Sequence, residues 1–227
     1  MKAIKKQIND LLKEKLLQYG FRKKDNVTYY RISNDTIQEL VFVFSANGEK
    51  KVSYLSYTAS FICLDIEEMA SKWGESIGYI GVNVGSLMPK PCYKEWRFTV
   101  DCSDEYIWQA LDEVMFTVSH YAIPYLERFS IKEKIAYGLE TGTLSTVYDM
   151  TERWLPLYYI SCGKNDRACM LVDEAIRRRT LDFPMNEYKA MQAIYGEEAI
   201  QIPPNKALES YLPFAEKFKQ MIESEKA

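Results

Sequence analysis

The chain has 227 residues, of which 47% are hydrophobic and 27% charged, and its formal net charge is −3. A folded chain of this length buries roughly 70–75% of its extended surface, enough for one large domain or two unequal ones, and this composition is far from that of a disordered protein. No apolar run reaches the ~20 residues that a membrane-spanning helix needs. Five scattered cysteines favour reduced thiols in a cytoplasm. We therefore expect a cytoplasmic globular protein that makes no use of a membrane.

Charge is unevenly placed along the chain. Residues 1–31 hold nine lysines and arginines against three acidic residues, a net of +6, so the rest of the chain carries −9. A basic N-terminal segment on an acidic body could meet nucleic acid or an acidic partner. Because nonspecific nucleic-acid binders are usually basic over the whole domain, we interpret this segment as a solvated helix face and do not expect nucleic acid as the partner.

The first half of the chain predicts a helix followed by antiparallel strands. Apolar residues at helical spacing run from Ile4 to Tyr19, and Gly20 is placed to end the helix in a left-handed cap. Strand patterns then cover 27–32 and 37–44, with a turn composition between them that favours a hairpin. A second reversal at 47–50 leads into an alternating strand over 52–64. Its residues Leu55, Tyr57, Ala59, Phe61 and Cys63 should face one way, and Ser56, Thr58 and Ser60 the other.

The next segments predict a short helix from Asp65 to Trp73, strands over 77–84 and 96–100, and a long helix over 103–121 that begins at the N-cap Ser103. The long helix has apolar residues on a second side as well, among them Trp108 and Phe116. A helix that is apolar on two sides is normally covered on two sides. Pro124 should end or kink it.

Strand patterns stop near Gly138–Gly142, and the rest of the chain predicts helices over 147–157, 167–179 and 207–223. We therefore expect an α+β fold: a largely antiparallel sheet of about five strands packed by helices, followed by an all-helical C-terminal segment. The predicted domains are residues 1–138 and 139–227. The second is expected to dock on the first and to cover Phe116 or Ile123.

Residues 4–138 resemble the bacterial family known as domain of unknown function 4304. The similarity lies in the leading helix, the Gly-Phe-Arg-Lys-Lys turn at 20–24, the Tyr29-Tyr30-Arg31 strand and the Tyr-Ala-Ile-Pro-Tyr-Leu element at 121–126. The family implies a bacterial origin and brings no activity that transfers to particular residues.

A weaker similarity lies in the C-terminal third. Tyr159, Gly163, Ala168, Val172 and Ala175 fall at the spacings of one tetratricopeptide-like helical hairpin. The Trp-Leu-Gly start of that motif is absent, and no second copy follows. One such hairpin is not a solenoid, which needs about three repeats to be stable.

The sequence lacks most of the patterns that carry chemistry. It contains one histidine, no Cys-x-x-Cys pair, no Gly-x-Ser-x-Gly elbow and no phosphate-binding Gly-x-x-x-x-Gly-Lys loop. Gly78, Gly81 and Gly85 have the wrong spacing for a dinucleotide fingerprint and indicate a bulge or close packing instead. We expect no metal and no cofactor.

Three side chains are candidates for a site. Arg31 and Arg97 each stand within a strand among aromatic residues, where a guanidinium can bind a carboxylate or phosphate in a bidentate manner. The structural alternative is cross-strand pairing with acidic neighbours or stacking on a ring. His120 could act as a general base, but no carboxylate stands at i±4, which favours an exposed or interfacial histidine.

Two classes of function remain. The first is a non-catalytic binding or protein-interaction domain, whose partner would be another protein. The abundance of tyrosine and the helical hairpin favour this class. The second is an enzyme or small-anion-binding protein that uses arginine and carboxylates. A deep pocket joining Arg31 or Arg97 to two or more carboxylates would favour the second class.

Overall fold

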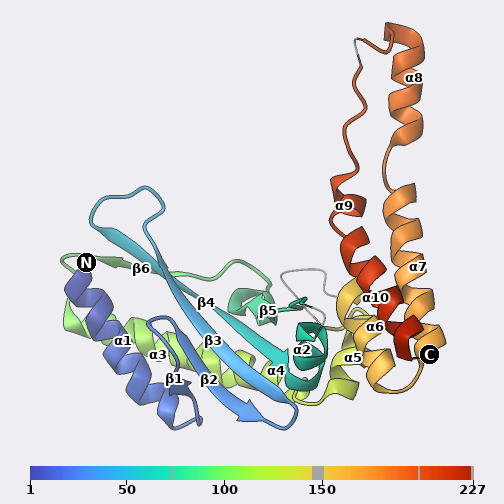
Figure 1. Ribbon diagram of the computed structural model, residues 1–227. Coiled ribbons are helices and arrows are strands. Elements are labelled where there is room, and N and C mark those ends of the chain that lie inside the picture. Colours follow the sequence, from blue (N-terminus) through green and yellow to red (C-terminus); the bar gives the residue numbers. More distant parts are fainter. Residues whose placement is uncertain (73, 145–150, 199, 226–227) are drawn as a thin grey trace. The chain divides into compact units, whose positions relative to one another are not determined.

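Figure 1 shows a computed structural model of the chain, which describes residues 1–72, 74–144, 151–198 and 200–225. The chain divides into two compact units. Unit 1 comprises Met1–Glu68 and Gly78–Met150, and unit 2 comprises Met69–Ile77 and Thr151–Ala227. Among the described helices, none is both long enough and apolar enough to cross a lipid bilayer.

Unit 1 is built on a six-stranded sheet. Its strands are β1 (Arg22–Lys23), β2 (Thr28–Ser33), β3 (Thr36–Ser45), β4 (Val52–Cys63), β5 (Ile80–Asn83) and β6 (Trp96–Thr99). The order is β1-β2-β3-β4-β5, and β6 pairs with the first half of β4 while β5 pairs with its second half. Every one of these pairings is antiparallel. The predicted α+β fold with a largely antiparallel sheet is confirmed.

The tight connections follow from turn chemistry. Asn34 has a φ of 49° in the β2–β3 turn, and Asn47 and Gly48 have φ of 44° and 77° in the β3–β4 turn. Asparagine and glycine are the residues that tolerate this left-handed conformation best. Gly20, with a φ of 79°, lies just after the first helix as expected. The basic turn that follows it differs from the prediction, because Arg22 and Lys23 form the edge strand β1.

The helices of unit 1 supply the other layer. They are α1 (Lys2–Leu17), α2 (Leu64–Ser71, which continues into unit 2), the 3₁₀ turn η1 (Val84–Leu87), α3 (Asp104–Thr117), the π-helical turn η2 (Val118–Ala122), α4 (Ile123–Arg128) and α5 (Lys132–Glu140). Hydrogen bonds tie one face of the sheet to them: Tyr29 donates to Asn9 O at 3.0 Å, and Gln38 Nε2 to Leu126 O at 2.8 Å. The core of unit 1 lies between these layers (Figure 1).

The alternation predicted for β4 is confirmed with one exception. Leu55, Tyr57, Ala59, Phe61 and Cys63 are buried, and Ser56 and Thr58 are partly exposed. Ser60 differs, since it is fully buried. The reason is its neighbour on β5, where a Cβ built at Gly81 would lie 2.6 Å from the Ser60 Cβ. The close packing predicted for this glycine is therefore present.

The long helix predicted over 103–121 is interrupted near its end. α3 begins after Ser103, whose hydroxyl accepts a hydrogen bond from the Tyr106 N–H as an N-cap does. After Thr117 the helix widens into the π turn η2, in which the Ile123 N–H bonds to Val118 O. Pro124 has no N–H to give to the preceding turn. Pro124 lies in the first turn of the next helix, α4, where a missing N–H costs nothing.

In unit 2 the described regular elements are all helices, as predicted for the C-terminal segment, and they are joined by turns and one longer irregular segment after α8. Its helices are α6 (Thr151–Ser161), α7 (Asn165–Leu181), α8 (Met185–Tyr195), α9 (Lys206–Glu209) and α10 (Leu212–Glu225). α6 and α7 form a hairpin around Gly163, with Ala168, Val172 and Ala175 buried in it. α8 extends beyond the hairpin, and the segment after it returns alongside (Figure 1).

Several boundaries differ from the sequence predictions. The strand predicted over 77–84 is limited to Ile80–Asn83, and the helix predicted over 207–223 is split into α9 and α10. α5 crosses the predicted 138/139 domain boundary, and neither α5 nor α8 was predicted. Trp73, the predicted end of α2, and residues 147–150, the predicted start of α6, lie outside the described residues. That the C-terminal segment covers Phe116 or Ile123 stays a prediction.

Candidate functional site

Arg31 lies on the buried face of the sheet, opposite Gln38 in the β2–β3 register. Its Nε donates to Gln38 Oε1 at 2.8 Å and its Nη1 to Tyr19 O at 3.0 Å. Its guanidinium carbon lies 4.8 Å from the centre of the Phe21 ring, and Nη2 lies 3.5 Å from a carboxylate oxygen of Glu127. The guanidinium thus connects the end of α1, the sheet and α4. Its contacts with Gln38 across the strands and with the Phe21 ring are of the structural kind considered for this arginine from the sequence.

Arg97 lies on β6 opposite Tyr54. Its Nη2 is 3.8 Å from Glu49 Oε2, and its side chain is 55% exposed. The Tyr54 hydroxyl also donates to Glu49, so the carboxylate has two partners on this edge of the sheet. Arg97 lines an open hollow of about 340 Å³ together with Thr99, Cys102, Ser103 and Tyr106. No carboxylate stands among these described lining residues, although Glu49 already partners the arginine.

The two arginines do not share a site. Arg31 aligns across the sheet with Gln38 and Phe61, whereas Arg97 aligns with Tyr54. Phe61 and Tyr54 are an odd number of residues apart on β4, so their side chains point to opposite faces of the sheet. Each arginine meets one carboxylate within ion-pair distance among the described residues, Glu127 for Arg31 and Glu49 for Arg97.

His120 lies exposed in the π turn η2. Its ring stacks on Phe116 with the ring centres 4.0 Å apart, and Nδ1 lies 3.0 Å from Phe116 O and 2.9 Å from Ser119 Oγ. A backbone carbonyl only accepts hydrogen bonds, so the neutral tautomer that fits has its proton on Nδ1. The Nε2 atom is then the ring nitrogen available to another group.

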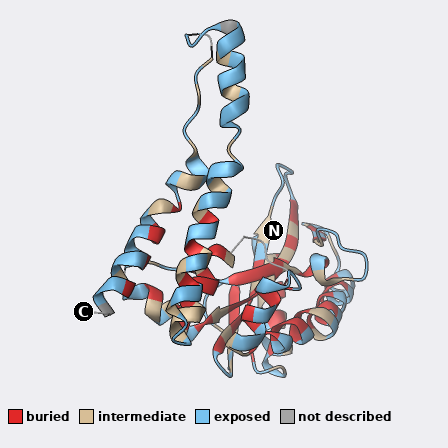
Figure 2. Cartoon of the chain, turned by 90° about the vertical axis from the view of Figure 1, so that its right-hand side faces the viewer, coloured by how far each residue is buried: buried red, intermediate tan, exposed pale blue. Residues whose placement is uncertain are grey.

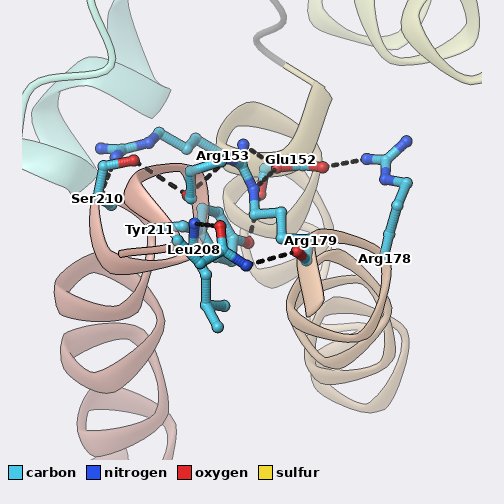
Figure 3. A network of polar contacts seen from close by, with 9 residues as sticks. Glu152, Arg153, Arg178, Arg179, Leu208, Ser210 and Tyr211 are labelled. Carbon is cyan, nitrogen blue, oxygen red and sulfur yellow. Dashed lines mark hydrogen bonds and ion pairs between the residues drawn. The ribbon is translucent and has the colours of Figure 1, made fainter. Parts of the chain in front are cut away.

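Unit 2 contains a buried ionic network that the sequence did not predict (Figure 3). The Glu152 side chain on α6 is only 6% exposed, and both of its carboxylate oxygens are paired with α7. Arg178 donates to Oε1, and Arg179 Nε donates to Oε2 at 2.6 Å. Positive charge in the last turn of α7 complements the helix dipole. The structure adds that two of the three consecutive arginines hold this carboxylate.

The same network extends to α9 and α10. Arg179 Nη1 donates to Ala207 O at 2.8 Å, and its guanidinium lies 4.9 Å from the ring centre of Tyr211. The Tyr211 hydroxyl donates to Glu152 O at 2.9 Å (Figure 3). Each of these contacts connects two helices, so the network holds the helices of unit 2 together. Glu152 and Arg179 are too far apart in sequence for a local pattern to reveal the pair.

The cysteines and acidic residues give no sign of a reactive or metal-binding cluster. No group of three or more histidine, cysteine or acidic side chains able to hold a metal occurs among the residues that the structure describes. All five cysteines are free thiols. Burial raises the pKa of the Cys63 thiol, and its hydrogen bond to Asp65 Oδ1 at 3.0 Å raises it further. A thiol that keeps its proton is a poor nucleophile.

Comparison with protein-family models, with curated proteins and with solved structures finds no match to this chain. The resemblance of residues 4–138 to the domain of unknown function 4304 and that of residues 159–175 to a tetratricopeptide-like hairpin therefore stay predictions.

Proposed function

We propose that this chain is a non-catalytic protein-interaction protein, and that it contacts its partner through α8 of unit 2. The observation that carries the proposal is that α8 has no buried side chain among its described residues. An isolated helix of this length is marginal in water, because most helical stability in proteins comes from packing an apolar face. A helix that buries no side chain within its own protein can gain this stability by packing against another molecule.

One side of α8 is already in use. Gln192 Nε2 donates to Ile200 O at 2.9 Å, and the Tyr188 ring stacks near Phe183 with the ring centres 5.8 Å apart. These contacts tie the helix to the segments before and after it within the same unit. They fix the direction of the helix and leave its remaining surface available.

The rest of the helix and the end of α7 present apolar side chains to solvent. Ile194 is 73% exposed and Leu181 67%, and Met185 and Met191 are also exposed. Figure 2 shows this part of unit 2 in the colours of exposed and intermediate residues, in contrast to the hairpin that supports it. Exposed methionine and aliphatic side chains on one helix are typical of helix-in-groove recognition.

Charge around these side chains indicates the chemistry of the partner. Asp182, Glu187, Glu197 and Glu198 are exposed near α8, where Lys189 is the one basic residue between positions 182 and 198. A complementary surface would be an apolar groove with lysine or arginine at its rim. The partner is therefore proposed to be a protein of that kind. A cytoplasmic setting is part of the proposal and is supported by the five free thiols.

The test replaces Ile194 by glutamate in the full chain and compares it with Ile32→Glu, an equally drastic change at a side chain that is 68% exposed on β2. Both proteins are used for co-purification from native extract, followed by analysis of the bound proteins. We expect a protein bound by the wild type and by Ile32→Glu to be lost in Ile194→Glu. Identical sets of bound proteins for all three would contradict the role of α8.

A further inference from the structure

A second surface feature lies in unit 1, at the place where the long helix widens. It is an open hollow of about 390 Å³ beside the π turn, between η1, η2, α4 and the turn that follows α5. We call it the π-turn hollow. Its described lining consists of Ser86, Leu87, His120, Tyr121, Pro124, Tyr125, Arg128, Phe129 and Thr143.

The backbone around the π-turn hollow departs from regular helix for a local reason. Pro124 cannot donate to the preceding turn, and the Ile123 N–H bonds instead to Val118 O five residues back. Single π turns inside α-helices are frequent at functional sites. On the opposite wall, η1 is held close to the loop after it, since a Cβ at Gly85 would lie 2.1 Å from Cys92 O.

The polar side chains of the π-turn hollow suit an anion. Arg128 provides a permanent positive charge, His120 a ring nitrogen, and Ser86 and Thr143 provide hydroxyl groups. The described lining contains no aspartate or glutamate, although the chain as a whole carries a net charge of −3. A cation in a hollow without a carboxylate is the arrangement that favours binding of a negative group.

Arg128 differs in this respect from the two arginines that the sequence singled out. Arg31 and Arg97 each have a carboxylate partner within the protein. The guanidinium of Arg128 lies 5.2 Å from the centre of the Phe129 ring, and no described carboxylate lies within ion-pair distance of it. An arginine held against an aromatic ring keeps its planar fork of donors oriented for a bidentate acceptor.

We propose that the π-turn hollow binds a small organic oxyanion, either a carboxylate or a phosphate group carried on an apolar body. Arg128 binds the anionic group, and the hydroxyl of Ser86 supplies a further donor. Tyr121 and Phe129 contact the apolar body of the ligand. This site is independent of α8, so the proposal does not rest on the protein-interaction function and can be tested separately from it.

The test is a titration of the full chain with inorganic phosphate and, separately, with benzoate, followed by amide chemical shifts in two-dimensional NMR. We expect saturable shifts at Ser86, His120 and Arg128 with at least one probe, and an affinity reduced by about tenfold or more in Arg128→Ala. Tighter binding of benzoate would assign the ligand as a carboxylate, and tighter binding of phosphate as a phosphate group.

Two further variants keep the test decisive. Arg22→Ala removes one exposed arginine elsewhere in unit 1 and should leave the binding unchanged. Arg128→Lys keeps the charge but loses the planar fork, so its affinity should fall between those of the wild type and Arg128→Ala. The proposal is overturned if neither probe gives saturable shifts up to about 10 mM, or if folded Arg128→Ala and Arg128→Lys both bind as the wild type does.

Discussion

At the scale of single residues, the arginines of this chain differ in what their guanidinium groups touch. The Arg31 side chain is 17% exposed. It donates hydrogen bonds to Gln38 and to Tyr19 O and also stacks on the Phe21 ring. Arg97 is 55% exposed and meets Glu49 at 3.8 Å. A part-buried guanidinium with several acceptors contributes much more to stability than an exposed ion pair does, since solvent screens the latter.

We therefore expect Arg31→Ala to lower the free energy of unfolding by about 1–3 kcal/mol, because it leaves the Tyr19 carbonyl and the Gln38 side chain without their donor. Arg97→Ala should cost less than about 1 kcal/mol. Urea unfolding of the two variants and the wild type measures both effects. Equal stability losses would show that the Arg31 contacts carry no special weight.

Arg31 and Arg97 were predicted from aromatic neighbours in the sequence, and Arg31 does stack on an aromatic ring. That either arginine binds a ligand stays a prediction. Arg31 stacks on Phe21, the residue that follows the helix-ending glycine, and not on its neighbours along the strand. Side chains of adjacent strand residues point to opposite faces, so a neighbour in sequence is not a neighbour in space. Arg128, at the end of α4, is different in that its guanidinium lies against its neighbour in the sequence, Phe129.

At the scale of elements, local chemistry decided which parts of the fold were predictable. The β2–β3 and β3–β4 hairpins were predicted because Asn34, Asn47 and Gly48 specify tight turns within a few residues. β1 has only two residues and α8 has no buried face, so neither leaves a periodic apolar pattern. The pairing of Glu152 with Arg178 and Arg179 depends on how two helices meet, which no local pattern contains.

The Glu152 network gives a prediction for the helices of unit 2. Replacing Glu152 by glutamine removes the negative charge that faces Arg178 and Arg179, and leaves the guanidinium groups with a neutral amide. Breaking one partner of a buried ion pair costs about 3–5 kcal/mol. Because both arginines are partly exposed, we expect a smaller loss of about 2 kcal/mol, measured by thermal or urea unfolding.

The matched control for this variant is Asp173→Asn, which removes a carboxylate on α7 that pairs with Lys219 at 2.6 Å. Both side chains of that pair are about half exposed or more, so its loss should cost less than about 1 kcal/mol. If Glu152→Gln were as stable as Asp173→Asn, the buried network would not be what holds α6 to α7.

At the scale of the whole molecule, the two units are interlaced along the chain. Residues 69–77 leave unit 1 and belong to unit 2, where Glu75 pairs with Lys217 at 2.6 Å and with Arg153 at 3.9 Å. A change in composition near Gly138–Gly142 indicated where the helical segment begins. It gave no signal for this insertion, because a segment of nine residues is too short to show a change in composition.

Buried tyrosines make the free energy of unfolding of the two units depend on pH to different extents. Burial raises the pKa of Tyr29 from 10.0 to about 12, with a further contribution from Asp10, and burial also raises the pKa of Tyr57 and Tyr125. All three lie in unit 1, and Tyr211, whose pKa burial raises, lies in unit 2. In the unfolded chain a tyrosine loses its proton near pH ~10.

Between pH ~10 and ~12 the unfolded chain therefore binds fewer protons than the native one, so stability falls as pH rises. Each tyrosine contributes about 1.4 kcal/mol per pH unit, or about 4 kcal/mol per unit for the three in unit 1. We expect unit 1 to unfold at lower pH than unit 2. Because every described strand lies in unit 1, the infrared sheet band should disappear before the helix band, together with a rise in phenolate absorbance.

Tyr29→Phe should reduce the slope of the unfolding free energy of unit 1 against pH by about a third. Tyr93→Phe, at a 69% exposed site, should leave that slope unchanged. Phenolate absorbance that rises while the sheet band persists would contradict this account.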